Sequence, residues 1–210
     1  RPKVLREALE NDALQDTSHD FGRTIIPALL AGGASVFAYD FSLSRVPGDE
    51  EPAPYWRDIG TVDSYWEASM DLISVSPPLN LYNSKWALKS LSPHLPPAKF
   101  VFADAASGRT GIATDSMVAD GCIVSGGTIH RSILFPRVRI NSYSRVEECV
   151  LMDGVDVGRG ARLRKVIADK GVKIPPRVEI GFDPENDRKR FHVSGGGVVV
   201  LPKGVVVPPA

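Results

Sequence analysis

Small and aliphatic residues recur every six positions between residues 116 and 181, and this period constrains the fold more than any other feature of the chain. A period of six fits neither an α-helix, at 3.6, nor a simple strand, at 2. It predicts a β-helix, in which each unit is a short strand plus a corner and three units close a coil of about 18 residues. The stretch has room for roughly three to four such coils. One phase of the repeat contains Cys122, Thr128, Leu134, Ile140, Val146 and Met152, the phase beside it contains Ile123, Ile129 and Phe135, and the register then slips by one to Leu151, Val157 and Leu163.

The composition is that of an ordinary globular protein, with 43% hydrophobic and 24% charged residues among 210. Lys plus Arg and Asp plus Glu are both 25, so nothing indicates a nucleic-acid or membrane-surface partner, which would favour a basic surface. No apolar run approaches the length of a membrane span, and the N-terminus does not have the pattern of a signal peptide. Cys122 and Cys149 form no metal-binding motif, and we expect both to be buried in a cytoplasmic protein.

The rest of the chain alternates helical patterns with loops. Five prolines between residues 77 and 97 exclude a continuous helix and predict an extended connection between two domains. The charged segment 183–190 is expected to be an insertion, Gly195–Gly197 a flexible turn, and residues 205–210 a tail. The expected regular elements are helices at residues 2–14, 22–31 and 62–75, and strands at 35–41, 99–103 and, as a final edge strand, 198–201.

Two motifs outside the repeat combine charged and aromatic residues. The segment SHDFG, residues 18–22, can be read as a helix cap around Asp20. The segment YWRDIGT, residues 55–61, can be read as a platform for a sugar with a metal or hydroxyl ligand, or as a surface ion pair beside buried aromatic residues. Asp63 could cap the helix that follows. His130 is the one candidate catalytic histidine within the repeat, and it has no carboxylate close to it in the sequence.

Taken in order, the segments SHDFG, YWRDIGT, SYWEASMDL (64–72), PPAKF (96–100), SILFPRVRIN (132–141) and VGRGARLRKVI (157–167) resemble the bacterial ADP-glucose pyrophosphorylases, also called glucose-1-phosphate adenylyltransferases. The resemblance extends from about Leu5 to Val200. It implies a mixed fold: the C-terminal end of a nucleotidyltransferase α/β domain followed by a left-handed parallel β-helix of the hexapeptide type. The expected domains are residues 1–76 for the catalytic portion, 77–98 for the connection, 99–204 for the β-helix and 205–210 for the tail.

The resemblance also implies an enzyme of glycogen-type α-glucan synthesis that makes ADP-glucose and pyrophosphate from ATP and glucose 1-phosphate. The family's glycine-rich nucleotide loop does not occur in this sequence. Since the first residue is Arg and the chain opens within a helical pattern, we expect it to be the C-terminal half of the enzyme and inactive alone.

The family's functional residues can be carried over to a few positions. Asp58 would be catalytic as a ligand of Mg²⁺, and Asp20, Phe21 and Trp56 would line the glucose pocket. Lys170, in VIADKGVKIP, and Lys203, in GGVVVLPKG, would bind phosphorylated metabolite effectors, although either could be a solvated corner residue.

The resemblance further implies a homotetramer that associates through the β-helix. The alternatives are a self-contained hexapeptide β-helix that serves as a scaffold, and an acyltransferase that uses His130.

Overall fold

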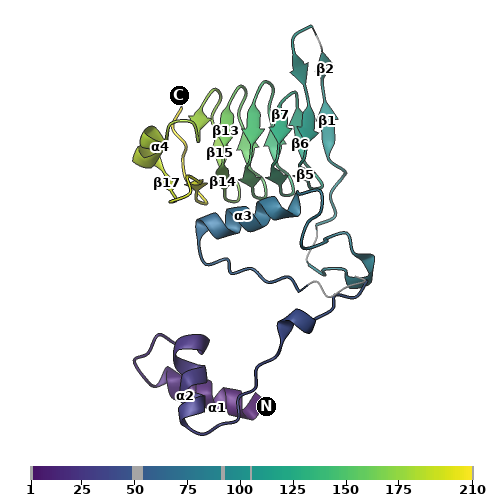
Figure 1. Ribbon diagram of the computed structural model, residues 1–210. Coiled ribbons are helices and arrows are strands. Elements are labelled where there is room, and N and C mark those ends of the chain that lie inside the picture. The colour runs from purple at the N-terminus through teal and green to yellow at the C-terminus, as the bar shows by residue number, and fades with distance from the viewer. Residues whose placement is uncertain (1, 49–53, 91–92, 105, 210) are drawn as a thin grey trace. The chain divides into compact units, whose positions relative to one another are not determined.

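The computed structural model describes residues 2–48, 54–90, 93–104 and 106–209. The chain forms two compact units, residues 1–45 and residues 46–210. The second unit contains a β-solenoid of about four turns (Figure 1), which confirms the predicted β-helix, and it follows a short helical region.

The first unit contains the two helical segments that the sequence predicts. It contains α1 (Pro2–Ala13), a wide helical turn η1 (Phe21–Ile25) and α2 (Ile26–Ala31). Ile25 is the one buried hydrophobic residue among the described residues of this unit. A core this small leaves most of the apolar side chains of α1 and α2 in contact with solvent.

The strand expected at residues 35–41 is not formed, and this prediction was wrong. Residues 34–40 are irregular and lead into a single 3₁₀ turn, η2 (Phe41–Leu43). The Asp40 carboxylate accepts hydrogen bonds from the backbone N–H of Ser42, at 3.0 Å, and from its hydroxyl. Such local bonds compete with a sheet ladder, and a strand needs a partner strand for its backbone groups.

Parallel strands stack along three sides of the β-helix in the second unit. Within the described residues, one side contains β1 (Lys99–Val101), β6 (Ile123–Ser125), β9 (Arg139–Ile140), β12 (Asp156–Val157) and β15 (Lys173–Ile174). The second side contains β4 (Ile112–Thr114), β7 (Thr128–His130), β10 (Arg145–Glu147), β13 (Arg162–Arg164) and β16 (Glu179–Ile180). The third contains the parallel strands β5 (Met117–Val118), β8 (Ile133–Leu134), β11 (Val150–Leu151), β14 (Val166–Ala168) and β18 (Val199–Leu201), and β17 (His192–Val193) pairs antiparallel with β18 at its end. A small hairpin, β2 (Ala103–Asp104) with β3 (Arg109–Thr110), projects beyond the first coil (Figure 1).

Each regular coil contains 17 residues rather than the expected 18, because Arg139 pairs with Asp156 and Asp156 in turn pairs with Lys173. Two sides of a coil advance by six residues and the third by five, which explains the slip in the sequence repeat. The innermost residues follow this rule from Leu134 through Ile140, Val146, Leu151, Val157, Leu163, Ala168 and Ile174 to Ile180.

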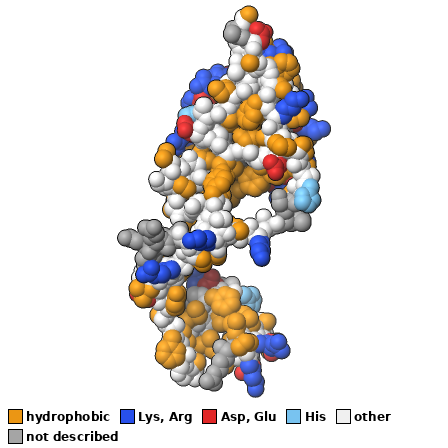
Figure 2. Space-filling model, turned by 90° about the vertical axis from the view of Figure 1, so that its right-hand side faces the viewer, with side chains coloured by type: hydrophobic (Ala, Val, Ile, Leu, Met, Phe, Trp, Pro, Cys, Tyr) orange, Lys and Arg blue, Asp and Glu red, His pale blue; other side chains and the backbone are white. Residues whose placement is uncertain are grey.

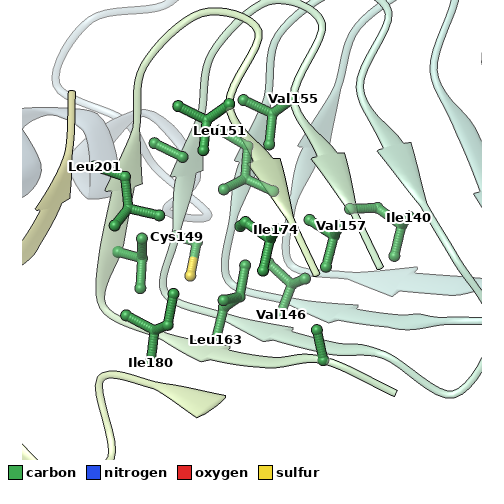
Figure 3. Close-up of a cluster of buried hydrophobic side chains, with 14 of the residues drawn as sticks. Ile140, Val146, Cys149, Leu151, Val155, Val157, Leu163, Ile174, Ile180 and Leu201 are labelled. Carbon is green, nitrogen blue, oxygen red and sulfur yellow. The ribbon is translucent and has the colours of Figure 1, made fainter. Parts of the chain in front are cut away.

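Several positions of the predicted inward phases lie outside the core of the coils, namely Ile123, Thr128, Phe135 and Met152. Thr128 is exposed and Phe135 is 39% exposed, whereas their neighbours Ile129 and Leu134 are buried. Ile129 and Leu134 are five residues apart. A strict count of six therefore assigns Thr128 and Phe135 to the inward phases together with these buried neighbours. Figure 3 shows the aliphatic side chains of successive coils stacked inside the solenoid. Cys149 lies in this core and Cys122 is also buried, as predicted, and burial raises the pKa of the Cys149 thiol to about 12.

The segment after β16 departs from the regular coil. The expected charged insertion forms a helix, α4 (Pro184–Arg190), with Asp183 capping its N-terminus. Strand β18 pairs with β14 on one side and with β17 on the other, so the prediction of a final edge strand was wrong. Beyond it, Val206 forms a bridge with Lys173 and Val207 is buried against the core.

Helix α3 (Val62–Leu72) lies along the third side of the β-helix (Figure 1). Met70 packs in a buried cluster with Val150, Ile167 and Val198, and the aromatic rings of Tyr65 and Trp66 pack against it. The helix was predicted over 62–75 with this apolar face, and it ends at residue 72. In the proline-rich segment that follows, the described residues form one short 3₁₀ turn, η3 (Ser84–Trp86), and no other helix or strand up to residue 98.

Candidate functional site

The segment Tyr55–Thr61 is irregular and leads directly into α3. Thr61 caps the helix, since its hydroxyl accepts a hydrogen bond from the Ser64 N–H at 3.1 Å and the Ser64 hydroxyl accepts one from the Thr61 N–H at 3.0 Å. Arg57 forms an ion pair with Asp71 on α3, and this bond raises the pKa of the Arg57 guanidinium. The segment is therefore tied to α3 at Arg57 and at Thr61.

Trp56 and Asp58 flank Arg57 and point into solvent. The Trp56 side chain is 73% exposed, and Asp58 is exposed as well. Among the described residues, the Asp58 carboxylate has no hydrogen-bond or ion-pair partner. The alternative reading of this motif, a surface ion pair beside buried aromatic residues, was wrong in its details: Arg57 pairs with Asp71 and not with Asp58, and Trp56 is exposed.

Asp20 and Phe21 lie at the start of η1 in the first unit. The Asp20 carboxylate accepts a hydrogen bond from the Arg23 N–H at 2.7 Å, and its carbonyl oxygen accepts one from the Thr24 N–H at 2.9 Å. This is the capping arrangement anticipated for SHDFG. Phe21 is 51% exposed. The structure brings Asp20 together with Phe21, and Trp56 together with Asp58, as two pairs in separate units.

Lys170 and Lys203 are brought together by a residue that the sequence analysis did not single out, Asp169. Its carboxylate accepts a hydrogen bond from the Lys170 N–H at 2.6 Å, and the Lys170 ammonium lies 3.7 Å from the same oxygen. The backbone N–H groups of Lys170 and Lys203 and the charges of both lysines hold the pKa of Asp169 below its ordinary value. The sequence places Asp169 beside Lys170, but its proximity to Lys203 depends on the pairing of β14 with β18.

A pocket of about 640 Å³ lies within the second unit, between α3, the proline-rich segment and the β-helix. Its walls are mainly apolar, and Figure 2 shows hydrophobic side chains around a hollow on this face. The lining includes Tyr55 and Ile59 from the segment before α3, Leu72 from α3, Leu81 from the proline-rich segment, and Met117 and Ile133 from the β-helix.

His130 has polar neighbours in the fold that its sequence context did not reveal. Its Nδ1 lies 3.0 Å from the Thr114 hydroxyl and 3.8 Å from a carboxylate oxygen of Asp115. These residues lie one coil before His130. The longer distance is not a hydrogen bond, so this group is not an oriented acid–base pair.

Nowhere in the described ranges do three or more His, Cys, Asp or Glu side chains gather closely enough to hold a metal ion. Mg²⁺ usually takes only one or two protein carboxylates and completes its coordination with water and phosphate oxygens. A single available carboxylate at Asp58 fits that requirement as one ligand.

No helix in the described part of the chain is both long and apolar enough to cross a membrane.

Comparison with known proteins agrees with this architecture. Residues 1–75 match the family model described as "Nucleotidyl transferase", and residues 96–201 match "GlmU-like, C-terminal hexapeptide". The second match agrees with the left-handed β-helix expected from the sequence.

Relatives named glucose-1-phosphate adenylyltransferase match nearly the whole chain. The protein from Thermus thermophilus is 53% identical over 206 residues, 97% of this chain and 49% of its own length. The Deinococcus radiodurans protein is 50% identical over 206 residues, again 97% of this chain and 49% of its own length. The one from Anaeromyxobacter is 46% identical over 207 residues, 98% of this chain and 50% of its own length. The chain thus spans about half the length of the curated relatives it matches, and by sequence and fold it belongs to the family of glucose-1-phosphate adenylyltransferases.

Proposed function

We propose that this chain forms part of an enzyme that makes ADP-glucose and pyrophosphate from ATP and glucose 1-phosphate, for α-glucan synthesis of the glycogen type. The observation that carries the proposal is the 46–53% identity, over 97–98% of the chain, to proteins named for the adenylyl transfer to glucose 1-phosphate. The two matched family models lie in the order expected of such an enzyme.

In this reaction an oxygen of the sugar phosphate attacks the α-phosphorus of ATP, and the protein contributes positioning and charge neutralisation. Trp56 would offer an apolar ring face to the sugar, and the roles expected for Asp20 and Phe21 are those of a hydroxyl acceptor and a second ring. Trp56 and Phe21 are both exposed, as surfaces that receive a ligand must be.

Asp58 would hold the divalent cation. Members of the nucleotidyltransferase family typically use such a metal, and Mg²⁺ is the ion we propose. It supplies charge neutralisation at the phosphates. The carboxylate of Asp58 has no protein partner in the described structure, which keeps both oxygens available, and the Arg57–Asp71 ion pair fixes the backbone beside it.

Lys170 and Lys203 would bind the phosphate of a metabolite effector. Both ammonium groups are exposed near a single carboxylate, Asp169. Two lysines around one aspartate leave a net positive charge, which suits a phosphate. The β-helix would assemble the subunits, and we propose a homotetramer.

Formation of ADP-glucose from ATP and glucose 1-phosphate tests the function directly. We expect none from the purified 210-residue chain, because its sequence lacks the glycine-rich nucleotide loop, and turnover from the intact enzyme that contains it. Turnover by the chain alone would contradict the proposal that this chain forms only part of the active enzyme. An intact enzyme active on another sugar phosphate or nucleotide but not on this pair would contradict the proposed substrates.

A further inference from the structure

Asp63, in the first turn of α3, contacts the turn between β17 and β18 more than 130 residues later in the chain. One oxygen of its carboxylate accepts a hydrogen bond from the Ser194 hydroxyl at 2.5 Å, and the other accepts one from the Gly196 N–H at 3.1 Å. The Ser194 hydroxyl in turn accepts a hydrogen bond from the Val198 N–H at 2.9 Å. We call Asp63, Ser194 and Gly196 the clasp. The helix cap considered for Asp63 is made by Thr61 instead.

The clasp requires glycine at one position. A Cβ on Gly196 would lie 2.6 Å from one carboxylate oxygen of Asp63 and 2.9 Å from its Cγ. A Cβ on Gly195 would come no closer than 4.0 Å to the same carboxylate. The glycine run that the sequence analysis read as a flexible turn therefore permits a close approach at Gly196.

Lys165, at a corner of the β-helix, completes the attachment of α3. Its ammonium donates a hydrogen bond to the Gly196 carbonyl at 2.6 Å and lies 4.6 Å from the centre of the Trp66 ring. The indole N–H of Trp66 donates a hydrogen bond to the Glu148 carbonyl at 2.8 Å. The beginning of α3 is thus held both by the turn 194–197 and by two successive corners of the coils.

The attachment of α3 to the turn 194–197 connects two parts of the chain that have roles in the proposed function. On one side, α3 is tied through Thr61 and through the Arg57–Asp71 pair to the segment that contains Asp58. On the other side, the turn 194–197 continues into β18, and Lys203 follows two residues after that strand. The connection passes through hydrogen bonds and regular elements at every step.

We propose that Asp63 is a positioning residue, whose clasp with Ser194 and Gly196 fixes the Asp58 segment on the β-helix and couples it to the strand that precedes Lys203. This rests on the function proposed above for the Asp58 segment and Lys203. Asp63 itself has no place in the sugar or metal site. Its proposed role is to fix the position of the segment 55–61.

The Gly196→Ala and Gly195→Ala variants form a matched pair that tests the clasp in the 210-residue chain. Both add one methyl group in the same turn, but only the first places it against Asp63. Hydrogen exchange of backbone amides over residues 55–72 should accelerate by about tenfold in Gly196→Ala, which corresponds to the loss of a charge-assisted hydrogen bond. It should remain at the wild-type rate in Gly195→Ala. Equal exchange in the two variants would overturn the clasp, whether or not the enzyme is active.

The Gly196→Ala and Ser194→Ala variants of the intact enzyme test the positioning role. We expect Gly196→Ala to raise the KM for glucose 1-phosphate by about tenfold and to weaken the response to an activating sugar phosphate, with the KM for ATP unchanged. Ser194→Ala, which removes a donor without adding bulk, should change the same constants in the same direction. A merely structural role would lower the melting temperature or the yield of active enzyme and leave both KM values alone. If the unsubstituted intact enzyme is active and neither variant shifts its KM for glucose 1-phosphate, the positioning role is overturned. If the unsubstituted intact enzyme is inactive, the proposed function is contradicted, and the hydrogen-exchange result alone decides whether the clasp exists.

Discussion

Asp58 is exposed and its carboxylate has no hydrogen-bond or ion-pair partner among the residues that the structure describes, so it can be altered without disturbing the segment around it. The backbone on either side is fixed by other residues, through the Arg57–Asp71 pair and the Thr61 cap. At the scale of the single residue, function and stability are therefore separable at this position.

We expect Asp58→Asn to lower kcat of the intact enzyme by about a hundredfold or more, because loss of a metal-holding carboxylate costs about 3 kcal/mol of transition-state stabilisation. Steady-state kinetics measures the effect, and a melting curve should match the wild type. Asp16→Asn, another exposed aspartate, serves as the control and should retain wild-type kcat. A near-normal kcat for Asp58→Asn would remove Asp58 from the site.

Glu147 is a buried carboxylate between two arginines of adjacent coils. Burial alone would raise its pKa, but the hydrogen bonds from Arg145 and Arg164 outweigh burial and hold the pKa below its ordinary value of 4.5. A group whose folded pKa is depressed stabilises the fold above its unfolded pKa and loses that contribution as the pH falls through the folded pKa.

Glu147→Gln should therefore destabilise the chain by about 1 kcal/mol at pH 7, a figure reduced because both arginines are half exposed. Urea denaturation at several pH values measures the difference. It should persist down to about pH 5 and shrink below the ordinary value of 4.5. A difference that stayed constant through this range would show that the carboxylate charge contributes nothing.

At the scale of the element, the coil is stabilised by residues whose phase is set by the short third side. Leu134 and Phe135 are adjacent on β8 and at the corner after it, yet Leu134 is 1% exposed and Phe135 is 39% exposed. Sequence periodicity assigned both to inward phases. The five-residue side makes only Leu134 a core residue.

Leu134→Ala should cost about 3 kcal/mol of unfolding free energy, since it leaves a cavity in a close-packed core. Phe135→Ala removes more atoms but should cost about 1 kcal/mol, because much of that ring already contacts water. Chemical denaturation of the two variants provides the comparison. The reverse order would contradict the coil register described here.

At the scale of the whole molecule, the strands of the first coil, β1, β4 and β5, each end one of the stacked sheets. Ile112 on β4 is 42% exposed there. Unpaired strand edges with apolar side chains favour association with another chain. This supports assembly through the β-helix, as proposed for the homotetramer.

We expect multi-angle light scattering of the intact enzyme at micromolar concentration to give the mass of a tetramer. Ile112→Lys, which places a charge at the exposed end of the β-helix, should shift the distribution towards smaller species. Lys3→Ala, at an exposed site on α1, should leave the mass unchanged. A purely monomeric wild-type enzyme would contradict the proposed assembly.

The sequence alone determined the β-helix, because the inward residues of a coil recur at short, nearly regular spacing and need no distant partner to be recognised. It also determined α1, α2 and α3, whose patterns and caps are local, and the family, through motifs such as YWRDIGT. The roles of Asp20, Phe21, Trp56, Asp58, Lys170 and Lys203 stay predictions from that resemblance.

The tertiary structure decided what depends on contacts between distant parts of the chain. The expected strand at 35–41 has no partner among the described residues of its unit, so local hydrogen bonds of Asp40 prevail. The neighbourhood of Lys170 and Lys203 depends on β18 joining β14 across an inserted helix. The contact of Asp63 with Ser194 and Gly196 likewise requires α3 to lie on the third side of the β-helix. Residue spacing does not predict such contacts, because they join residues that are far apart in the sequence and become neighbours only when the coils stack.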